Sequence, residues 1–265
     1  MASPVHNPIL RASLLLAMAV AASALAPGAM AQAPAPDHRE PVLVELFTSE
    51  GCSDCPPADA LLAELDSTQF VPGAQAIVLS EHVTYWNREG WTDPFSLDAM
   101  TDRQQQYKLQ FGLSDVYTPQ MVVDGAEQMV GNDRNKVESA ITRAAATPKL
   151  EMQILNAHQA ADRSVEFSVH VPAVPKATLV AALAESATRS EVARGENKGR
   201  TLNHVAVVRV LKDFGSSATD GRPLRLSGPK RSGAEATGNP LRLVVFLVNH
   251  KNGHVVAVAE QTLSQ

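Results

Sequence analysis

The sequence predicts an α/β domain followed by an all-β, sandwich-like domain. Up to residue 148, short continuous apolar runs alternate with amphipathic segments of helical spacing, which is the order of elements in an α/β fold. Beyond residue 148, short apolar runs follow one another with turn residues between them, and no helical pattern appears. Apolar residues make up 45% of the 265 residues, which is enough for a core and excludes extensive disorder.

Residues 1–31 are predicted to be a secretory signal peptide rather than part of the fold. Arg11 supplies a positive start, Ser13–Ala26 is an apolar run, and Ala29-Met30-Ala31 is a cleavage site of the A-x-A type. The run is too short for a stable membrane span, although an uncleaved anchor stays the alternative. No later segment approaches the length of a span, so none is expected in the mature chain. We therefore expect a periplasmic or secreted protein in an oxidising compartment.

The first domain is predicted to span residues 41–148, after a flexible leader over residues 32–40, which are Pro-rich and polar. Pro41–Phe47 is a nearly continuous apolar run and predicts a strand that is buried on both faces. Pro57 then opens a helix, whose apolar face consists of Ala58, Leu61, Leu62 and Leu65. Gln75–Ser80 predicts a second buried strand.

The next part of this domain combines an irregular segment with a helix. Residues 81–95 show no periodic pattern and carry both tryptophans. Ser96–Phe111 has helical spacing, and Gly112 is suited to cap its C-terminus. The predicted helix therefore ends just after residue 111.

A hairpin and a last helix complete the first domain. Pro119–Asp124 and Glu127–Val130 flank the dipeptide Asp124-Gly125, which is a strong signal for a β-hairpin. Asp133 can cap a final helix that runs to Ala146. The predicted order of elements in this domain is thus β-α-β-α-β-β-α.

The second domain, residues 149–265, is predicted from strands alone. Short strands separated by turn residues are typical of an antiparallel sandwich. Residues 215–238 are rich in Gly, Ser, Ala and charge, and are predicted as a mobile loop. The predicted strands are Leu150–Leu155, Ser164–Val171, Thr178–Glu185, Val205–Leu211, Leu241–Val248 and His254–Gln261.

Charge and cysteine content exclude several classes of function. The net charge of −5 argues against nucleic acid or an anionic membrane as a partner, because both require a basic surface. Cys52 and Cys55 are the only cysteines. Two cysteines cannot staple a scaffold together and cannot by themselves complete a tetrahedral zinc site.

Cys52 and Cys55 stand three residues apart at the predicted start of a helix. Free backbone N–H groups at a helix start stabilise a thiolate over a thiol, and in such pairs the thiol pKa can fall to roughly 3.5–7.5. The pattern predicts that Cys52 is the more exposed cysteine and attacks, and that Cys55 resolves the mixed disulfide. Asp54 lies between them and opposes thiolate formation, which argues against a strongly oxidising pair.

Two other interpretations of the cysteine pair stay open. One is a structural disulfide, although so small a ring stabilises a fold by only about 2 kcal/mol. The other is a copper or zinc site, for which His82 would have to join Cys52 and Cys55.

Longer stretches around the cysteines resemble a known family. These stretches are Phe47–Asp59 (FTSEGCSDCPPAD), His82–Trp86 (HVTYW), Tyr117–Val123 (YTPQMVV) and Arg194–Arg200 (RGENKGR). Together they are similar to a bacterial family of exported proteins in the thioredoxin-like superfamily, the domain-of-unknown-function twelve-twenty-three family. The resemblance covers nearly the whole mature chain. It implies a thioredoxin-like α/β domain and a redox site at the cysteines, and it implies no particular substrate.

The resemblance also implies further catalytic residues. Pro119 matches the proline before the hairpin of thioredoxin-like proteins, which is cis and faces the cysteines. Together with Thr118 it would offer a backbone edge to which a substrate peptide adds as a strand. Glu45 matches, with a spacing one residue longer, the buried acid upstream of the cysteines, and would exchange protons with Cys55. The alternatives are a solvent-facing carboxylate or one bonded to Thr48 or to backbone.

Aromatic and imidazole side chains are candidates for substrate contact. His82 follows the second strand, at the edge where α/β proteins build their sites, but a structural hydrogen bond is its alternative role. Trp86 and Trp91 are candidates for lining a substrate groove, with packing as the alternative. His204 and the stretch Arg194–Arg200 are predicted as a loop and the start of a strand; a phosphate site there is disfavoured because no helix follows.

The sequence therefore predicts an exported thiol–disulfide oxidoreductase that acts on thiols of exported proteins or on small thiols. No cofactor is predicted. With Cys52 and Cys55 as the only cysteines, turnover requires an external redox partner. The alternatives are a non-catalytic binding module whose disulfide is structural, and a copper or zinc carrier.

Overall fold

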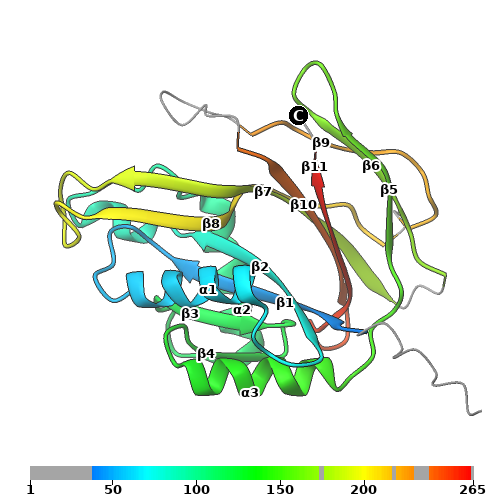
Figure 1. Ribbon diagram of the computed structural model, residues 1–265, viewed down its shortest axis with the longest axis horizontal. Coiled ribbons are helices and arrows are strands. Elements are labelled where there is room, and N and C mark those ends of the chain that lie inside the picture. Colours follow the sequence, from blue (N-terminus) through cyan, green and yellow to red (C-terminus); the bar gives the residue numbers. More distant parts are fainter. Residues whose placement is uncertain (1–37, 173–175, 217–218, 230–238, 264–265) are drawn as a thin grey trace, which may run out of the picture. The chain divides into compact units, whose positions relative to one another are not determined.

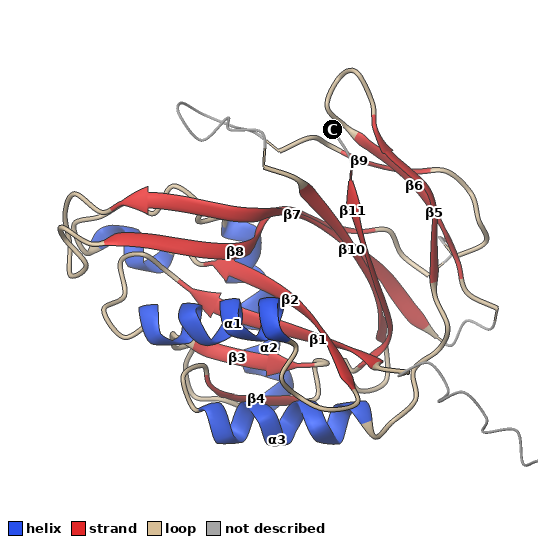
Figure 2. Cartoon of the chain, viewed as in Figure 1, coloured by secondary structure: helices blue, strands red, loops and turns tan. Residues whose placement is uncertain are grey.

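Two β-sheets and three α-helices make up the part of the chain that the structure describes, which is residues 38–172, 176–216, 219–229 and 239–263 (Figure 2). The structure is a computed structural model. By its contacts, Asp37–Gln265 forms one compact unit. The predicted signal peptide and the predicted leader up to residue 37 lie outside the described residues.

The elements alternate in the first part of the chain and are strands in the second. The first part contains β1 (Glu40–Thr48), α1 (Pro56–Thr68), β2 (Ala74–His82), the 3-10 helix η1 (Tyr85–Arg88), α2 (Asp98–Phe111), β3 (Gln120–Val123), β4 (Glu127–Val130) and α3 (Arg134–Ala145). The second part contains β5 (Gln153–Gln159), β6 (Val165–His170), β7 (Ala177–Glu191), β8 (Thr201–Asp213), β9 (Leu224–Leu226), β10 (Leu241–Asn249) and β11 (Val255–Leu263).

The larger sheet is mixed and has eight strands in the order β11-β10-β7-β8-β2-β1-β3-β4. β1 and β2 run parallel and end together, since Thr48 pairs with His82. β8 joins the other edge of β2 through the parallel pair of Ser80 and Val207. The smaller sheet has the order β5-β6-β9. In the view of Figure 1, α1 and α3 lie in front of the larger sheet and α2 lies behind it.

The predicted fold class, a thioredoxin-like α/β domain followed by an all-β sandwich-like domain, is wrong. The described residues are mostly β-structure, and β7, β8, β10 and β11 continue the sheet that β1–β4 begin. They do not form a separate sandwich. The boundary predicted at residue 148 concerns independent folding and stays a prediction.

β7 and β10 show why the sequence was misread. Their apolar runs, Thr178–Glu185 and Leu241–Val248, are nearly continuous. Such runs are typical of strands that are buried on both faces, whereas sandwich strands commonly have one solvent-exposed face. Local periodicity does not report which strand pairs with which, so the junction of β8 with β2 stayed hidden. In β7, Val180, Ala182 and Ala184 pack into the core shared with α1, and Leu179, Ala181 and Leu183 pack into a second core under the smaller sheet.

Turn and cap residues act as their types predict. Asp124 and Gly125 both have positive φ values, 49° and 61°, in the β3–β4 turn. Gly112 takes the left-handed conformation at the end of α2. The side chain of Asp133 accepts a hydrogen bond from Lys136 N and caps α3.

The second half departs from the predicted bounds. β7 and β8 reach further than expected, to Glu191 and from Thr201 respectively, and form a long hairpin. β9 lies inside the segment predicted as a mobile loop, residues 215–238, part of which lies outside the described residues. Among the described residues, no helix is both long and apolar enough to cross a membrane.

Candidate functional site

The two cysteines form a disulfide where β1 leads into α1. The Cα atoms of Cys52 and Cys55 are 5.5 Å apart, and Cys55 is the N-cap residue of the helix. Cys55 N donates a hydrogen bond to Cys52 O at 3.3 Å, and Pro56 opens the first turn. The pair therefore lies at the helix start, as its spacing predicts.

Both cysteines are buried. Cys52 is 1% exposed and Cys55 is 0% exposed, while Ser53 and Asp54 between them face solvent. The sequence predicted that Cys52 would be clearly the more accessible one. In this state neither cysteine offers an open face to a reagent.

A turn from the second half of the chain lies against the cysteines. This turn, Val192–Arg200, joins β7 to β8 and is termed the hairpin tip; Figure 1 shows it in yellow beside the blue loop between β1 and α1. Asn197 Nδ2 donates to the backbone oxygens of Cys52, at 2.8 Å, and Glu50, at 2.9 Å. Glu196 Oε2 accepts from Ser53 N at 3.0 Å. The cysteine loop, Ser49–Asp54, is thus held from outside as well as by α1.

Pro119 lies close to the start of α1. The Thr118–Pro119 peptide bond is cis, as predicted. A Cβ atom placed on Gly131 would lie 2.8 Å from Leu46 Cδ1 and 3.1 Å from both Ala58 Cβ and Pro119 Cβ. Strand β1, helix α1 and the segment before β3 therefore meet where only glycine fits.

Trp86 connects Thr118 to the cysteine loop. Its Nε1 donates to Thr118 Oγ1 at 2.7 Å, and its Cβ lies 3.1 Å from the position of a Cβ atom on Gly51. The second tryptophan, Trp91, donates from Nε1 to Glu50 Oε2 at 2.8 Å. Both are partly buried and contact Glu50 and Gly51 of the cysteine loop; their predicted role in lining a substrate groove stays a prediction.

A buried charged cluster lies beside the disulfide. It consists of Glu50, Asp59 and His204, which are 0%, 7% and 2% exposed. His204 Nε2 lies 3.3 Å from Glu50 Oε1, and His204 Nδ1 lies 3.8 Å from Asp59 Oδ2. Burial alone would lower the pKa of His204, but hydrogen bonds and charges of Asp59 and Glu50 outweigh it and raise this pKa to about 10. Thr48 Oγ1 and Ser190 Oγ donate to Asp59 and Glu50.

His82 lies in the same region, but its Nδ1 is already bonded to another side chain. It is fully buried, its Nδ1 lies 2.7 Å from Asp93 Oδ2, and its ring packs edge-on against His204 with the centroids 4.6 Å apart. Burial would raise the pKa of Asp93, but the charge and hydrogen bond of His82 lower it below its usual value. The structure therefore brings His82 near the cysteine loop, through Glu50 N bonded to Asp93, without giving it access to solvent.

Glu45 is not brought to the cysteines. Arg103 Nε donates to its Oε1 and Tyr107 to its Oε2, both at 2.5 Å, and both donors belong to α2. Its neighbour Leu46 points to the opposite face, toward Ala58 of α1. The carboxylate therefore faces the side of the sheet away from Cys55, and its predicted proton exchange stays a prediction without a supporting contact.

A second carboxyl group lies beside Glu45. Glu81 is fully buried and has no hydrogen-bond partner for either oxygen among the described residues. Burial, and next the charge of Glu45, raise the pKa of Glu81 well above its usual value. Arg103 lies within ion-pair distance of both carboxyl groups.

Sequence reasoning missed three residues of this site: Glu50, Asp59 and Asn197. Glu50 and Asp59 flank the cysteine pair, and their position next to it was the available signal. Asn197 lies in the stretch Arg194–Arg200 that carries the family resemblance, but its contact with Cys52 spans 145 residues of sequence and only the fold shows it. His204 was noted only as a strand residue.

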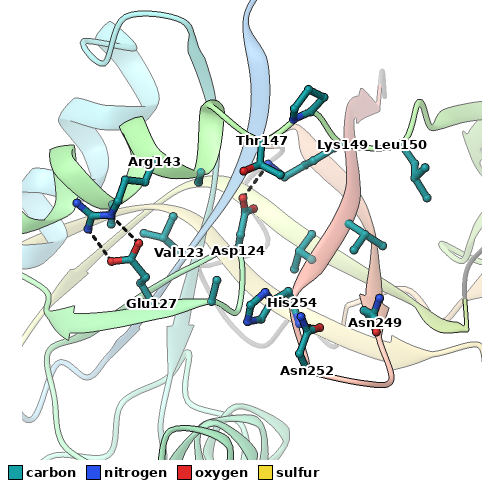
Figure 3. A pocket seen from close by; sticks show the side chains of 16 residues that line it. Val123, Asp124, Glu127, Arg143, Thr147, Lys149, Leu150, Asn249, Asn252 and His254 are labelled. Atoms are coloured by element: carbon teal, nitrogen blue, oxygen red, sulfur yellow. Dashed lines mark hydrogen bonds and ion pairs between the residues drawn. The ribbon is translucent and has the colours of Figure 1, made fainter.

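A large cleft lies elsewhere (Figure 3). It has a volume of about 810 Å³ and lies between α3, the β3–β4 turn and the β10–β11 turn. Asp124 lines the cleft. Its carboxylate pairs with Lys149 and accepts a hydrogen bond from Leu43 N, and neither partner belongs to the cysteine loop. Glu127 and Arg143 pair at its rim. The cleft is therefore separate from the disulfide.

No metal site was found among the described residues: no three His, Cys, Asp or Glu side chains are grouped so that they could hold an ion. The copper or zinc interpretation of Cys52, Cys55 and His82 thus has no supporting geometry here, since both sulfurs are in the disulfide and His82 Nδ1 is bonded to Asp93.

Known proteins are similar over most of the chain. A family model described as "Protein of unknown function (DUF1223)" matches residues 43–248. A crystal structure of an Agrobacterium tumefaciens protein, a structural genomics target, has a TM-score of 0.61 and 25% sequence identity, covering 84% of this chain and 94% of that chain. A Pseudomonas fluorescens alkylpurine DNA glycosylase bound to DNA has a TM-score of 0.21 and 15% identity, covering 51% of this chain and 36% of its own; so low a score carries no argument. No curated protein matches.

Proposed function

The chain belongs to the DUF1223 family, and we propose that it performs thiol–disulfide exchange at Cys52–Cys55. The observation that carries the proposal is a disulfide at the start of a helix, with Pro119, which comes from a distant segment, close to Ala58 in the first turn of that helix. This local arrangement resembles that of thioredoxin-like proteins, although the fold class of the whole chain differs from theirs.

The chemistry follows from the position of the sulfurs. A substrate thiolate attacks Cys52, the Cys52–Cys55 bond breaks, and Cys55 leaves as a thiolate at the N-terminus of α1, where the helix dipole favours negative charge. A second substrate thiol then attacks the mixed disulfide and releases Cys52. The substrate loses two electrons to form a disulfide, and the chain gains them; the reverse steps reduce a substrate disulfide.

Turnover needs a partner that restores the starting state of the pair. After one reaction the two cysteines are in the product state, and the sequence holds no other pair to recharge them. We propose a protein or small-molecule thiol system outside this chain as that partner. The proposed setting is a periplasmic or secreted one, in line with the predicted signal peptide over residues 1–31.

A non-catalytic binding module is the second candidate. The burial of both cysteines favours it, because a disulfide that no reagent reaches acts only as a brace. The cleft of about 810 Å³ beside Lys149 is of a size that binds small molecules, and supports a binding role independent of the disulfide.

Trapping of mixed disulfides distinguishes the two candidates. Cys55→Ser should accumulate mixed disulfides with disulfide-containing proteins of the native compartment, because the Cys52 thiolate attacks a substrate disulfide, one substrate sulfur leaves as a thiolate, and nothing resolves the product. Cys52→Ser should trap none and serves as the matched control. Mass spectrometry of non-reduced complexes gives the readout. Equal trapping by both variants would contradict the assigned roles, and no trapping by either would favour the binding module.

A further inference from the structure

The hairpin tip holds the backbone on both sides of Cys52. Asn197 binds the carbonyl oxygens of Glu50 and Cys52, and Glu196 binds Ser53 N. All three hydrogen bonds fall within residues 50–53, at 2.8–3.0 Å. Apart from these bonds, the hairpin tip packs against Trp91, since a Cβ atom on Gly195 would lie 3.0 Å from Trp91 Cβ.

The hairpin tip has a shape of its own. Gly199 N donates to Val192 O at 2.8 Å and Val192 N donates to Arg200 O at 3.0 Å, so the turn is closed by internal bonds. Of its residues only Val192 and Asn197 are buried. The internal bonds stay intact if the bonds to the cysteine loop break, so the hairpin tip can leave as one piece by a local opening.

One atom weakens the closed state. Asn197 is 0% exposed, and its Oδ1 is buried without a hydrogen-bond partner among the described residues, although its Nδ2 is fully used. A buried acceptor without a partner is unfavourable, and it regains a partner from water on opening. The closed state is thus held by hydrogen bonds of normal length, while one buried polar atom in it has no partner among the described residues. Such a balance suits a contact that opens and closes repeatedly.

We propose that the hairpin tip is a displaceable cover, and that the Cys52–Cys55 disulfide reacts only after the tip leaves the cysteine loop. This inference rests on the thiol–disulfide exchange proposed above, and it reconciles that activity with the burial of both cysteines. Opening frees the N–H group of Ser53 and the carbonyl oxygens of Glu50 and Cys52. A polypeptide backbone pairs with such groups, so the substrate class is a protein thiol presented on an extended segment.

The test measures how fast dithiothreitol reduces the disulfide in the full chain. The reagent is oxidised to its cyclic disulfide while the cysteine pair gains two electrons, and alkylation with mass spectrometry counts the reduced molecules. We expect Asn197→Ala and Glu196→Ala to be reduced about tenfold faster than wild type or more, because each lacks a bond that keeps the hairpin tip closed. The substitutions leave the cysteines and α1 unchanged.

Two matched controls lie in or beside the hairpin tip. Lys198→Ala changes an exposed side chain within it, and Glu191→Ala removes the same charge as Glu196→Ala at the end of β7. Because the three bonds to the cysteine loop come from Asn197 and Glu196, both control variants should be reduced within about twofold of the wild-type rate. A general effect of charge on the reagent would appear in Glu191→Ala.

Urea unfolding of each variant ensures that reduction occurs from the folded chain. If Asn197→Ala does not fold, Glu196→Ala decides, since its side chain is exposed. If folded Glu196→Ala is reduced at the wild-type rate, the hairpin tip does not control access to the disulfide and the proposal is wrong. That failure is distinct from failure of the proposed function: the Cys55→Ser trap can succeed while reduction rates are unchanged, and reduction rates can rise while the trap captures nothing.

Discussion

Protonated His204 is a counter-charge to two buried carboxyl groups beside the disulfide, Glu50 and Asp59, so its proton matters for stability. Its folded pKa of about 10 lies above the ordinary 6.5, which means that the folded chain binds this proton more tightly than the unfolded chain does. The stability that comes from this linkage is therefore fully present below about pH 6.5 and is lost as the pH rises through about 10.

We expect His204→Ala to lower the free energy of unfolding by about 3–5 kcal/mol near pH 6.5, because Glu50 and Asp59 stay buried without their counter-charge. The deficit should shrink toward pH 10, where wild type loses the same proton. Urea denaturation at several pH values measures it. His158→Ala, at an exposed histidine, is the control and should change little. A deficit that does not vary with pH would contradict the pKa shift.

A substitution at Glu45 tests whether a buried carboxyl group close in sequence to the cysteine pair takes part in catalysis. Its bonds to Arg103 and Tyr107 predict that Glu45→Gln loses about 1.5–3 kcal/mol of stability, because charge-assisted hydrogen bonds are lost. The rate at which Cys55 resolves a mixed disulfide should not change. Stopped-flow measurement of that rate is the readout. Slower resolution would instead support the proton exchange that the family resemblance implies.

Single residues were predictable where their role is local. Gly112 and Asp133 cap helices, and Asp124 turns a hairpin, because backbone conformation near a residue depends on that residue and its neighbours. The contacts of Glu45 and Asn197 were not predictable, because their partners Arg103 and Cys52 lie 58 and 145 residues away.

Elements meet most tightly at Gly131, where β1, α1 and the segment before β3 converge. Gly131→Ala would put a Cβ atom 2.8 Å from Leu46 Cδ1 and 3.1 Å from Pro119 Cβ. We expect it to lower stability by about 1–3 kcal/mol through overpacking and to slow disulfide exchange, because Leu46, Pro119 and α1 have to give way around the added methyl group. Thermal unfolding and an exchange assay with a small disulfide measure the two effects.

Gly73→Ala is the control for Gly131→Ala. Gly73 has a φ of 73°, but no atom lies within 4 Å of the position of its Cβ. The substitution should therefore lower stability by about 1 kcal/mol through backbone strain alone and leave exchange unchanged. If both variants slow exchange equally, the contact at Gly131 is not what positions the site.

The elements themselves were largely predictable, but not their partners. Continuous apolar runs marked β1, β2, β7 and β10, and helical spacing marked α1. A run that is apolar on both faces says that two layers cover it. It does not name those layers, and the fold class was wrong for that reason. β9, with three residues, is too short to show a pattern.

The whole molecule is held together by a sheet and by side chains that cross between its halves. Arg242 of β10 binds both oxygens of Asp66 at the end of α1, at 2.6 and 2.7 Å. His204 of β8 binds Glu50 beside the cysteines. The second half of the chain thus completes the core and the site of the first half.

Truncation tests that dependence. We expect residues 38–148 alone not to fold into a stable unit, because β2 loses its partner β8 and the core over α1 loses the wall that β7 and β10 supply. The residues of β7 in this wall are Val180, Ala182 and Ala184. Circular dichroism and urea unfolding of the fragment are the measurements. A cooperative unfolding transition with an intact disulfide would instead support the predicted boundary at residue 148.

The presence of just two cysteines has a consequence for errors in oxidation. A chain with two thiols can close one internal disulfide, and that is the pair joined in the structure. Oxidation therefore cannot produce a mispaired monomer, since any wrong pairing must join two chains. Mistakes appear as covalent dimers on a non-reducing gel, and they become rarer on dilution because they are bimolecular. A monomer band accordingly contains no mispaired molecule: its cysteine pair is closed, open or bound to a small thiol.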